Sequence, residues 1–315
     1  MKRLLVNKIK NRIRRYLNQR HRYDYSPENN GWKKYGNSPF FGDKKTGTVY
    51  DPYAVFVDGK FSIYTSFRKN GAIGKIDSWD GIHWNEPIVV LEGISDTWEN
   101  IVNRACVLFA NNKWHMWYCG LQNEVSQIGY AYSNDGIHFI RCSENPIISA
   151  KESFEGVSVM NPSVLWDSQR KLYRMWYSAG DNYEPDVICY AESSDGICWN
   201  KYKEPVLKPN LQHEWEKYKI GGCHVTELSE NELLMFYIGY QNLDVARICY
   251  AKSIDGKKWE RSGNNLIISP TKGSWDSDAV YKPTVIMNAK MIYLWYNGRK
   301  KYDEYLGCVI KNVEI

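Results

Sequence analysis

The chain has 315 residues, of which 15% are aromatic, and a formal net charge of +5. Nine basic residues and no acidic residue lie within residues 1–22, so the remainder carries a formal charge of −4. A mildly acidic body of this kind argues against a protein that binds nucleic acid across its surface.

The first element in chain order is a basic amphipathic helix, which we expect within a leader of residues 1–24. Four aliphatic residues recur at four-residue intervals among its basic side chains: Leu5, Ile9, Ile13 and Leu17. An apolar stripe on a cationic helix suits peripheral contact with an anionic membrane through residues 1–22. A solvated basic segment, or one that packs on a partner protein, accounts equally for this pattern.

Two features of the sequence predict a cytoplasmic protein. If the leader binds the inner membrane, the protein is also peripheral to that membrane. The leader lacks the continuous apolar stretch of a secretory signal peptide. The eight cysteines lie in strand-like runs with no Cys-x-x-Cys spacing, which favours reduced thiols over a disulfide framework.

From residue 25 to residue 315 the sequence is organised as repeats of short strands. Four copies of a Ser-x-Asp-Gly turn contain the pairs Asp80-Gly81, Asp135-Gly136, Asp195-Gly196 and Asp255-Gly256. Upstream of these turns, and once more near the end of the chain, a bulky residue precedes a tyrosine: Ile63-Tyr64, Trp117-Tyr118, Trp176-Tyr177, Phe236-Tyr237 and Trp295-Tyr296. Each unit is typical of four antiparallel strands, with Asp-Gly turning between the third and fourth. The sequence therefore predicts an all-β, five-bladed β-propeller.

The fifth repeat reaches Ile310 without a fourth strand. The missing piece has a counterpart near the other end of the sequence, where Gly31-Trp32 mirrors Gly196 and Trp199. We therefore expect an N-terminal strand to close the last blade, which removes the open sheet edges.

Function is expected where equivalent positions of the blades differ from one another. The starts of the five innermost strands carry dissimilar polar or flexible residues: Asp51, Arg104, Asn161, Gly222 with His224, and Lys282. Loops between second and third strands, which emerge on the same face, add Arg68, Asp181, Glu184, Asp244 and Arg299. Because strand starts converge on the central channel of a propeller, these residues predict a binding site there.

A site that cleaves or forms a glycosidic bond needs two carboxyl groups. Asp51 is the first candidate, with a capping aspartate at a strand start as its alternative role. Asp278 is the candidate for the second carboxyl group, followed by Glu227 and Glu155. The acids that follow Trp or Phe in each repeat, Glu155 and Asp276 among them, are expected to be mainly structural.

The remaining site residues are expected to bind substrate: Arg68, Arg104, Asn161, His224, Lys282 and Arg299. Their cationic character suggests a sugar that carries a carboxylate, a phosphate or a nucleotide. A ring of structural ion pairs is the alternative. The histidines are scattered among different blades, so we expect no metal site and no cofactor.

With these residues in view, the chain resembles the five-bladed propellers of glycoside hydrolase families 43 and 32 and the mannoside phosphorylases of family 130. The resemblance covers residues 30–312 and rests on the blade pattern, Asp51-Pro52 and the run from Trp275-Asp276 to Lys282-Pro283. It implies a carbohydrate-active protein with a base carboxylate at Asp51. Where family 43 has carboxylates in blades three and four, this chain has Asn161 and Gly222-Cys223-His224.

Three functions follow as hypotheses. The chain is similar to uncharacterised family members found beside bacterial polysaccharide-assembly genes, which implies glycosyl transfer or phosphorolysis in surface polysaccharide metabolism. An exo-acting glycosidase that hydrolyses oligosaccharides is the second hypothesis. A non-catalytic, glycan-binding propeller is the third.

Overall fold

The computed structural model describes residues 31–312 except 36–37, 43–45, 182–184, 230–231, 262, 264 and 289. The basic helix expected within residues 1–24 and the loop residue Glu184 lie outside the described residues. Within the described part of the chain, no helix has both the length and the apolar character required to span a membrane.

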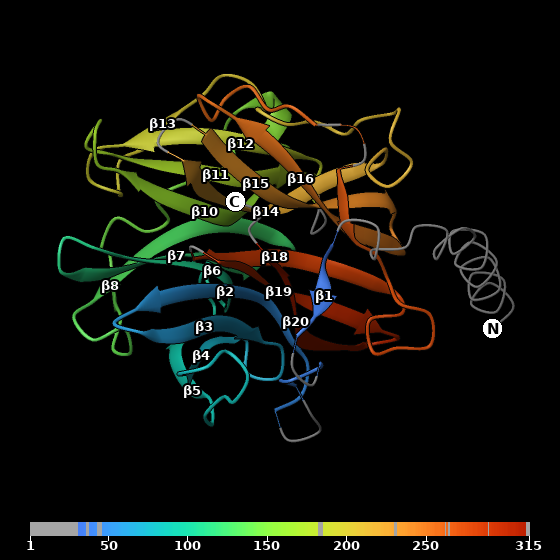
Figure 1. Cartoon of the computed structure of the whole chain (residues 1–315). Coiled ribbons are helices and arrows are strands. Elements are labelled where there is room, and N and C mark those ends of the chain that lie inside the picture. Colours follow the sequence, from blue (N-terminus) through green and yellow to red (C-terminus); the bar gives the residue numbers. More distant parts are fainter. Residues whose placement is uncertain are drawn as a thin grey trace, which may run out of the picture.

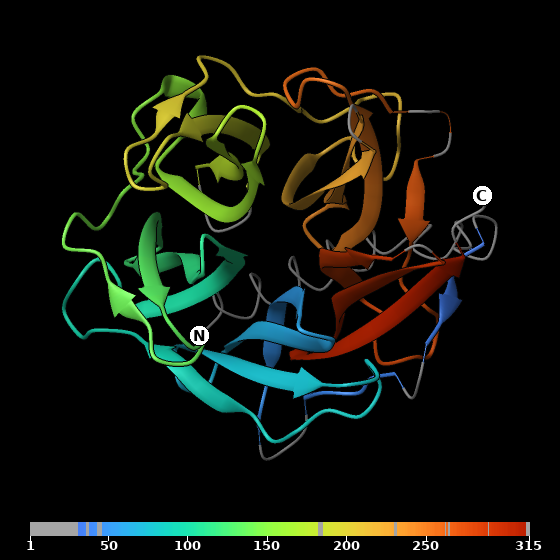
Figure 2. The same ribbon diagram turned by 60° about the vertical axis from the view of Figure 1, so that its left-hand side comes forward.

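Five four-stranded antiparallel sheets surround a central axis as the blades of a propeller (Figures 1 and 2). Blade one comprises β2 (Val49–Val57), β3 (Lys60–Phe67), β4 (Ala72–Ser78) and β5 (Ile88–Glu92). Blade two comprises β6 (Ile101–Ala110), β7 (Lys113–Gln122), β8 (Val125–Ser133) and β9 (Ile140–Arg141). Blade three comprises β10 (Ser158–Asp167), β11 (Leu172–Gly180), β12 (Val187–Ser193) and β13 (Asn200–Lys201), preceded by the 3₁₀ turn η2 (Ser153–Glu155).

Blade four comprises β14 (Lys219–Ser229), β15 (Glu232–Asn242), β16 (Val245–Ser253) and β17 (Leu266–Ile268). Blade five comprises β18 (Ala279–Met287), β19 (Met291–Lys300), β20 (Asp303–Asn312) and the N-terminal strand β1 (Lys33–Lys34). The predicted fold and its closure are therefore confirmed. In Figure 2 the blue β1 lies at the outer edge of the red fifth blade.

The Ser-x-Asp-Gly turns have the predicted place between third and fourth strands. In blade two, Gly136 has φ of 73°, Asp135 Oδ1 accepts two backbone N–H groups, and Ser133 Oγ accepts the Gly136 N–H. A glycine accommodates this positive φ at no steric cost, which explains its recurrence.

A buried acid in four of the blades ties the second strand to the fourth strand, or in blade four to the loop that precedes it. In each case a tyrosine hydroxyl of the second strand donates to the acid and a basic side chain pairs with it. The four sets are Glu99 with Tyr118 and Arg141, Glu155 with Tyr177 and Lys201, Glu216 with Tyr237 and Arg261, and Asp276 with Tyr296 and Lys34. These contacts agree with the expectation that the repeated acids are mainly structural, which stays a prediction, and β1 supplies the cation for the fifth blade.

Adjacent blades are joined by hydrogen bonds from a second strand to the next blade's Asp-Gly turn. Trp117 Nε1 donates to the carbonyl of Gly196 at 2.9 Å, and Trp176 Nε1 donates to that of Gly256 at 2.8 Å. In blade one the Tyr64 hydroxyl makes this bond, to Gly136 at 2.8 Å. Tyr64 is thus equivalent to Trp117, so the sequence alignment of Ile63 with Trp117 was one residue out of register.

Candidate functional site

Every innermost strand contains a bulge at its start, and the same five positions that differ in sequence occupy these bulges. The residues concerned have positive φ: Asp51 (52°), Arg104 (54°), Asn161 (54°), Gly222 (56°) and Lys282 (39°). The strand pairing shifts register at each of them. A left-handed conformation costs a non-glycine residue about 1–3 kcal/mol and tends to occur at functional sites. The bulges therefore mark the channel mouth as the place to look for a site.

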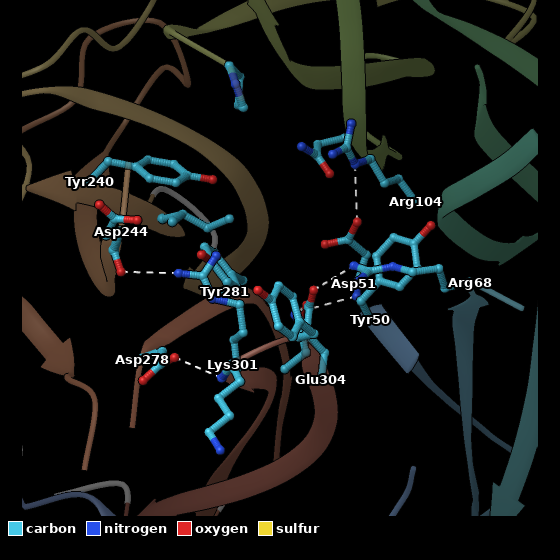
Figure 3. A pocket seen from close by; sticks show the side chains of 16 residues that line it. Tyr50, Asp51, Arg68, Arg104, Tyr240, Asp244, Asp278, Tyr281, Lys301 and Glu304 are labelled. Carbon is cyan, nitrogen blue, oxygen red and sulfur yellow. Dashed lines mark hydrogen bonds and ion pairs between the residues drawn. The ribbon is translucent and has the colours of Figure 1, made fainter. Parts of the chain in front are cut away.

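A pocket of about 550 Å³ lies at this end of the channel (Figure 3). Blades four and five supply most of its lining, and the rest comes from the innermost strands of blades one to three and from the loops that carry Arg68 and Pro185. Six of the eight predicted site residues line it: Asp51, Arg68, Arg104, Asn161, Asp278 and Arg299. The other lining residues are Tyr50, Pro185, Ile238, Tyr240, Asp244, Tyr281, Asn297, Lys301, Tyr302 and Glu304.

Asp51 is fixed in this pocket by its neighbours on two other blades. Arg104 Nε donates to Asp51 Oδ2 at 3.1 Å, and the backbone N–H of Asp51 donates to Asn297 Oδ1 at 3.2 Å. Both Asp51 and Arg104 are buried. A carboxylate held in this way keeps one orientation toward the pocket and has its charge balanced by the guanidinium group.

Asn161 presents a buried hydrogen-bond acceptor without a partner. Its backbone N–H donates to Cys119 Sγ at 3.2 Å, and its side chain is 3% exposed. Among the described residues, nothing donates to Asn161 Oδ1. An unsatisfied buried acceptor costs about 1–3 kcal/mol, so a ligand hydroxyl that donates to this oxygen recovers that cost.

His224 and Lys282 lie outside the described lining of the pocket. Lys282 is fully buried, and its ammonium group donates to the Cys223 carbonyl at 2.8 Å and lies 5.9 Å from the Tyr53 ring. Burial lowers the pKa of Lys282. Burial, with the positive charge of Lys282, lowers the pKa of His224 to about 3. Both side chains thus lie between the innermost strands, and their expected role in substrate binding stays a prediction.

The candidates for the second carboxyl group occupy three different environments. Asp278 lines the pocket, where its Oδ2 accepts the backbone N–H of Lys301 at 2.8 Å. Figure 3 shows it apart from Asp51. Glu227 is exposed on β14, beyond the bulge and away from the pocket. Glu155 is fully buried within its structural set.

Glu304 is a pocket carboxyl group that the sequence analysis missed. It is 8% exposed, accepts from Arg68 at 2.7 Å and also accepts from the Asn297 side chain. Burial raises the pKa of Glu304, and the charge of nearby Asp51 acts in the same direction. The position breaks the repeat, because Ser126 and Ala246 occupy the equivalent places in blades two and four. Extending the comparison of blades to their third strands would have found it.

The charges of the pocket lining cancel when all of its carboxyl groups are ionised. Four basic side chains, Arg68, Arg104, Arg299 and Lys301, face four acidic ones, Asp51, Asp244, Asp278 and Glu304. Much of the cationic character expected from sequence is therefore taken up by ion pairs such as Arg104 with Asp51 and Arg68 with Glu304.

Comparison with known proteins identifies related sequences. The family model described as "Glycosyl hydrolases family 32 N-terminal domain" matches residues 55–222. The chain is 29% identical over 177 residues to the uncharacterized protein MT1551 of Mycobacterium tuberculosis, covering 54% of this chain and 56% of that protein. It is 25% identical over 202 residues to the 1,2-beta-oligomannan phosphorylase of a Thermoanaerobacter species, covering 61% of this chain and 62% of that enzyme. The matches thus span little more than half of the length of these relatives.

Solved structures show the same fold. A thermostable family-43 glycoside hydrolase superposes with a TM-score of 0.67 at 18% sequence identity, covering 87% of this chain and 93% of that chain. The resemblance to families 32 and 43 and to mannoside phosphorylases is confirmed by these comparisons.

Proposed function

Because this chain belongs to the family described as glycosyl hydrolases family 32, N-terminal domain, we propose that it is an enzyme that makes or breaks glycosidic bonds in the pocket around Asp51. The observation that carries this proposal is the Asp51 carboxylate, which lines an open pocket and is oriented by Arg104. The Asn161 side-chain oxygen, which accepts from no residue that the structure describes, supports it, because sugar hydroxyls are donors that suit such an acceptor.

Asp51 acts on the anomeric centre of the bound glycosyl unit. The transition state of glycosidic-bond cleavage carries positive charge near this carbon. A fixed carboxylate stabilises that charge, and when water is the acceptor it also takes up the water's proton.

We favour phosphate or the hydroxyl of a second sugar as the acceptor of the glycosyl unit. The reaction is then phosphorolysis or glycosyl transfer, and we place it in bacterial surface polysaccharide metabolism. Similarity to an oligomannan phosphorylase supports this choice. The four basic side chains of the lining also support it, because they can share their donors with a phosphate. Hydrolysis by an exo-acting glycosidase is the second candidate, favoured by the hydrolase family to which the chain belongs.

The experiment is turnover by the purified full chain on β-1,2-mannobiose, aryl furanosides, aryl pyranosides and nucleotide sugars, each with and without phosphate. We expect bond cleavage that requires phosphate and yields a sugar 1-phosphate, or transfer from an activated donor. Cleavage without phosphate indicates hydrolysis. Binding of panel sugars by calorimetry with no turnover overturns the enzymatic proposal and leaves a glycan-binding propeller.

The choice between a neutral and an anionic sugar is tested by the same panel. The balanced charges of the lining favour a neutral glycosyl unit, whereas the sequence suggested a carboxylated or phosphorylated one. Tighter binding of glucuronides than of the matching glucosides supports the anionic sugar.

The cellular part of the proposal places the protein in the cytoplasm with its leader on the inner membrane. Removal of residues 1–22 deletes nine basic residues, so we expect much weaker flotation with phosphatidylglycerol vesicles at low salt and unchanged thermal unfolding. Flotation that does not change on truncation contradicts the membrane role.

A further inference from the structure

We propose that Glu304 is the proton donor that works opposite Asp51 in the pocket. The inference rests on the proposed function, because a donor to the leaving sugar has meaning only if a glycosidic bond reacts there. It assigns the second carboxyl group to the third strand of blade five, where the sequence analysis did not look for it.

A short network of hydrogen bonds places Glu304 next to Asp51. Asn297 of β19 bridges the two residues: its Oδ1 accepts the Asp51 backbone N–H, and its Nδ2 donates to Glu304 Oε2. Both residues line the same pocket, and both are 8% exposed. Figure 3 shows Glu304 on the same side of the pocket as Asp51 and Tyr50. The two carboxyl groups therefore face one ligand from neighbouring blades.

The surroundings of Glu304 favour its protonated form. Burial and the charge of Asp51 raise the pKa of Glu304. The charges of Arg68 and Arg299 oppose this effect without reversing it. The Arg68 side chain is 50% exposed, so solvent screens its charge, whereas Arg104 beside Asp51 is buried. A carboxyl group with a raised pKa, placed beside a carboxylate that is held by an arginine, is the arrangement of an acid and its partner base.

A protonated Glu304 can keep its present hydrogen bonds. A carboxylic acid has one O–H donor and retains acceptor capacity at its oxygens, so Glu304 still accepts from Arg68 and Asn297. The O–H is then available to the pocket. Arg68 and Asn297 orient the acid in the same way as Arg104 orients Asp51.

The step balances with water or phosphate as the acceptor. The bond between the anomeric carbon and the glycosidic oxygen breaks, its electron pair goes to that oxygen, and the proton of Glu304 goes to the same atom. The leaving sugar departs as a neutral alcohol. The acceptor oxygen bonds to the anomeric carbon, and Asp51 takes the proton when the acceptor is water. Exchange with solvent restores both groups.

Asp278 is less suited to this role on the geometry. Its Oδ2 accepts a backbone N–H of Lys301, and it lies apart from Asp51 in Figure 3. Glu304 shares a bridging residue with Asp51 and is more deeply buried.

The test compares Glu304→Gln with Asp278→Asn on two glycosides of one sugar, a 2,4-dinitrophenyl glycoside and a methyl glycoside or disaccharide. The first leaving group departs without protonation and the second does not. For Glu304→Gln we expect kcat/KM to fall by about 10²–10⁴-fold on the methyl glycoside or disaccharide, whose leaving group is poor. On the 2,4-dinitrophenyl glycoside the loss should be less than tenfold. The variant should also lose the basic limb of the pH profile. Asp278→Asn should not show this dependence on the leaving group.

Equal losses on both glycosides with an unchanged pH profile overturn the proposal, because Glu304 then only positions Arg68 and Asn297. The same holds if Asp278→Asn shows the dependence instead. If the wild-type chain turns over no glycoside, the proposed function has failed, and Glu304 is then assessed by urea unfolding between pH 4 and pH 8.

The sign of the unfolding effect follows from the direction of the pKa. A carboxyl group with a pKa raised above its ordinary 4.5 contributes stability below that pH and loses it as the pH rises through the folded-state value. Glu304→Gln should therefore gain stability relative to wild type as the pH rises. A difference that does not change with pH means that Glu304 is not held protonated, and the assignment as proton donor fails.

Discussion

Substitution of Asp51 by asparagine is expected to lower turnover by about 10²–10⁴-fold and to leave the fold intact. The amide keeps the shape of the carboxylate and can still accept from Arg104, but it carries no charge to stabilise the anomeric centre and takes up no proton. Asparagine also tolerates the positive φ of 52° at this bulge. The loss should therefore fall on kcat, measured with the substrate that the panel identifies.

Asp58→Asn is the matched control for this experiment. Asp58 lies just beyond the other end of β2, is exposed, and also has φ of 52°. The same chemical change there should leave kcat and KM at their wild-type values. Equal activity of Asp51→Asn and wild type would remove Asp51 from the chemistry and require another origin for any turnover.

Replacement of Glu155 by alanine is expected to cost about 3–5 kcal/mol of unfolding free energy, the usual range for removing one partner of a buried ion pair. The change leaves the ammonium group of Lys201, 15% exposed, without its carboxylate and removes the acceptor of the Tyr177 hydroxyl. Urea unfolding measures the effect. Because Glu155 lies outside the pocket lining, the kcat of the folded fraction should stay unchanged.

Glu144→Ala serves as the control, because this glutamate is exposed in a loop of the preceding blade. Its removal should change the unfolding free energy by less than about 0.5 kcal/mol. A catalytic defect in folded Glu155→Ala protein, or a stability equal to that of wild type, would contradict the structural assignment of the repeated acids.

These predictions distinguish catalytic from structural carboxyl groups, a distinction that the sequence alone could make only in part. The repeat revealed that Glu155 and Asp276 have counterparts in other blades, which predicted that both acids are buried in recurring contacts within the blades. It also singled out Asp51, because no other blade has an acid at that position. The turns at Gly136 and its counterparts, and the closing role of β1, followed from the same local pattern.

Features that depend on three-dimensional register could not be predicted in this way. Tyr64 replaces a tryptophan, and only the strand pairing shows that its hydroxyl takes over the bond of the indole N–H. His224 and Lys282 look like site residues in sequence, but their side chains are buried between the innermost strands. Glu304, by contrast, could have been found from sequence, because its position in the third strand also breaks the repeat.

A crystal structure of the Asp51→Asn variant with β-1,2-mannobiose, or with the panel member that the wild-type chain turns over, tests most directly whether Asp51 acts on a bound glycosyl unit. We expect a glycosyl unit in the pocket, with its anomeric carbon facing position 51. Its glycosidic oxygen should lie within hydrogen-bonding distance of Glu304, and one hydroxyl should donate to Asn161. A sugar bound outside this pocket, or a pocket that stays empty at saturating sugar, would show that Asp51 does not act on a glycosidic bond there.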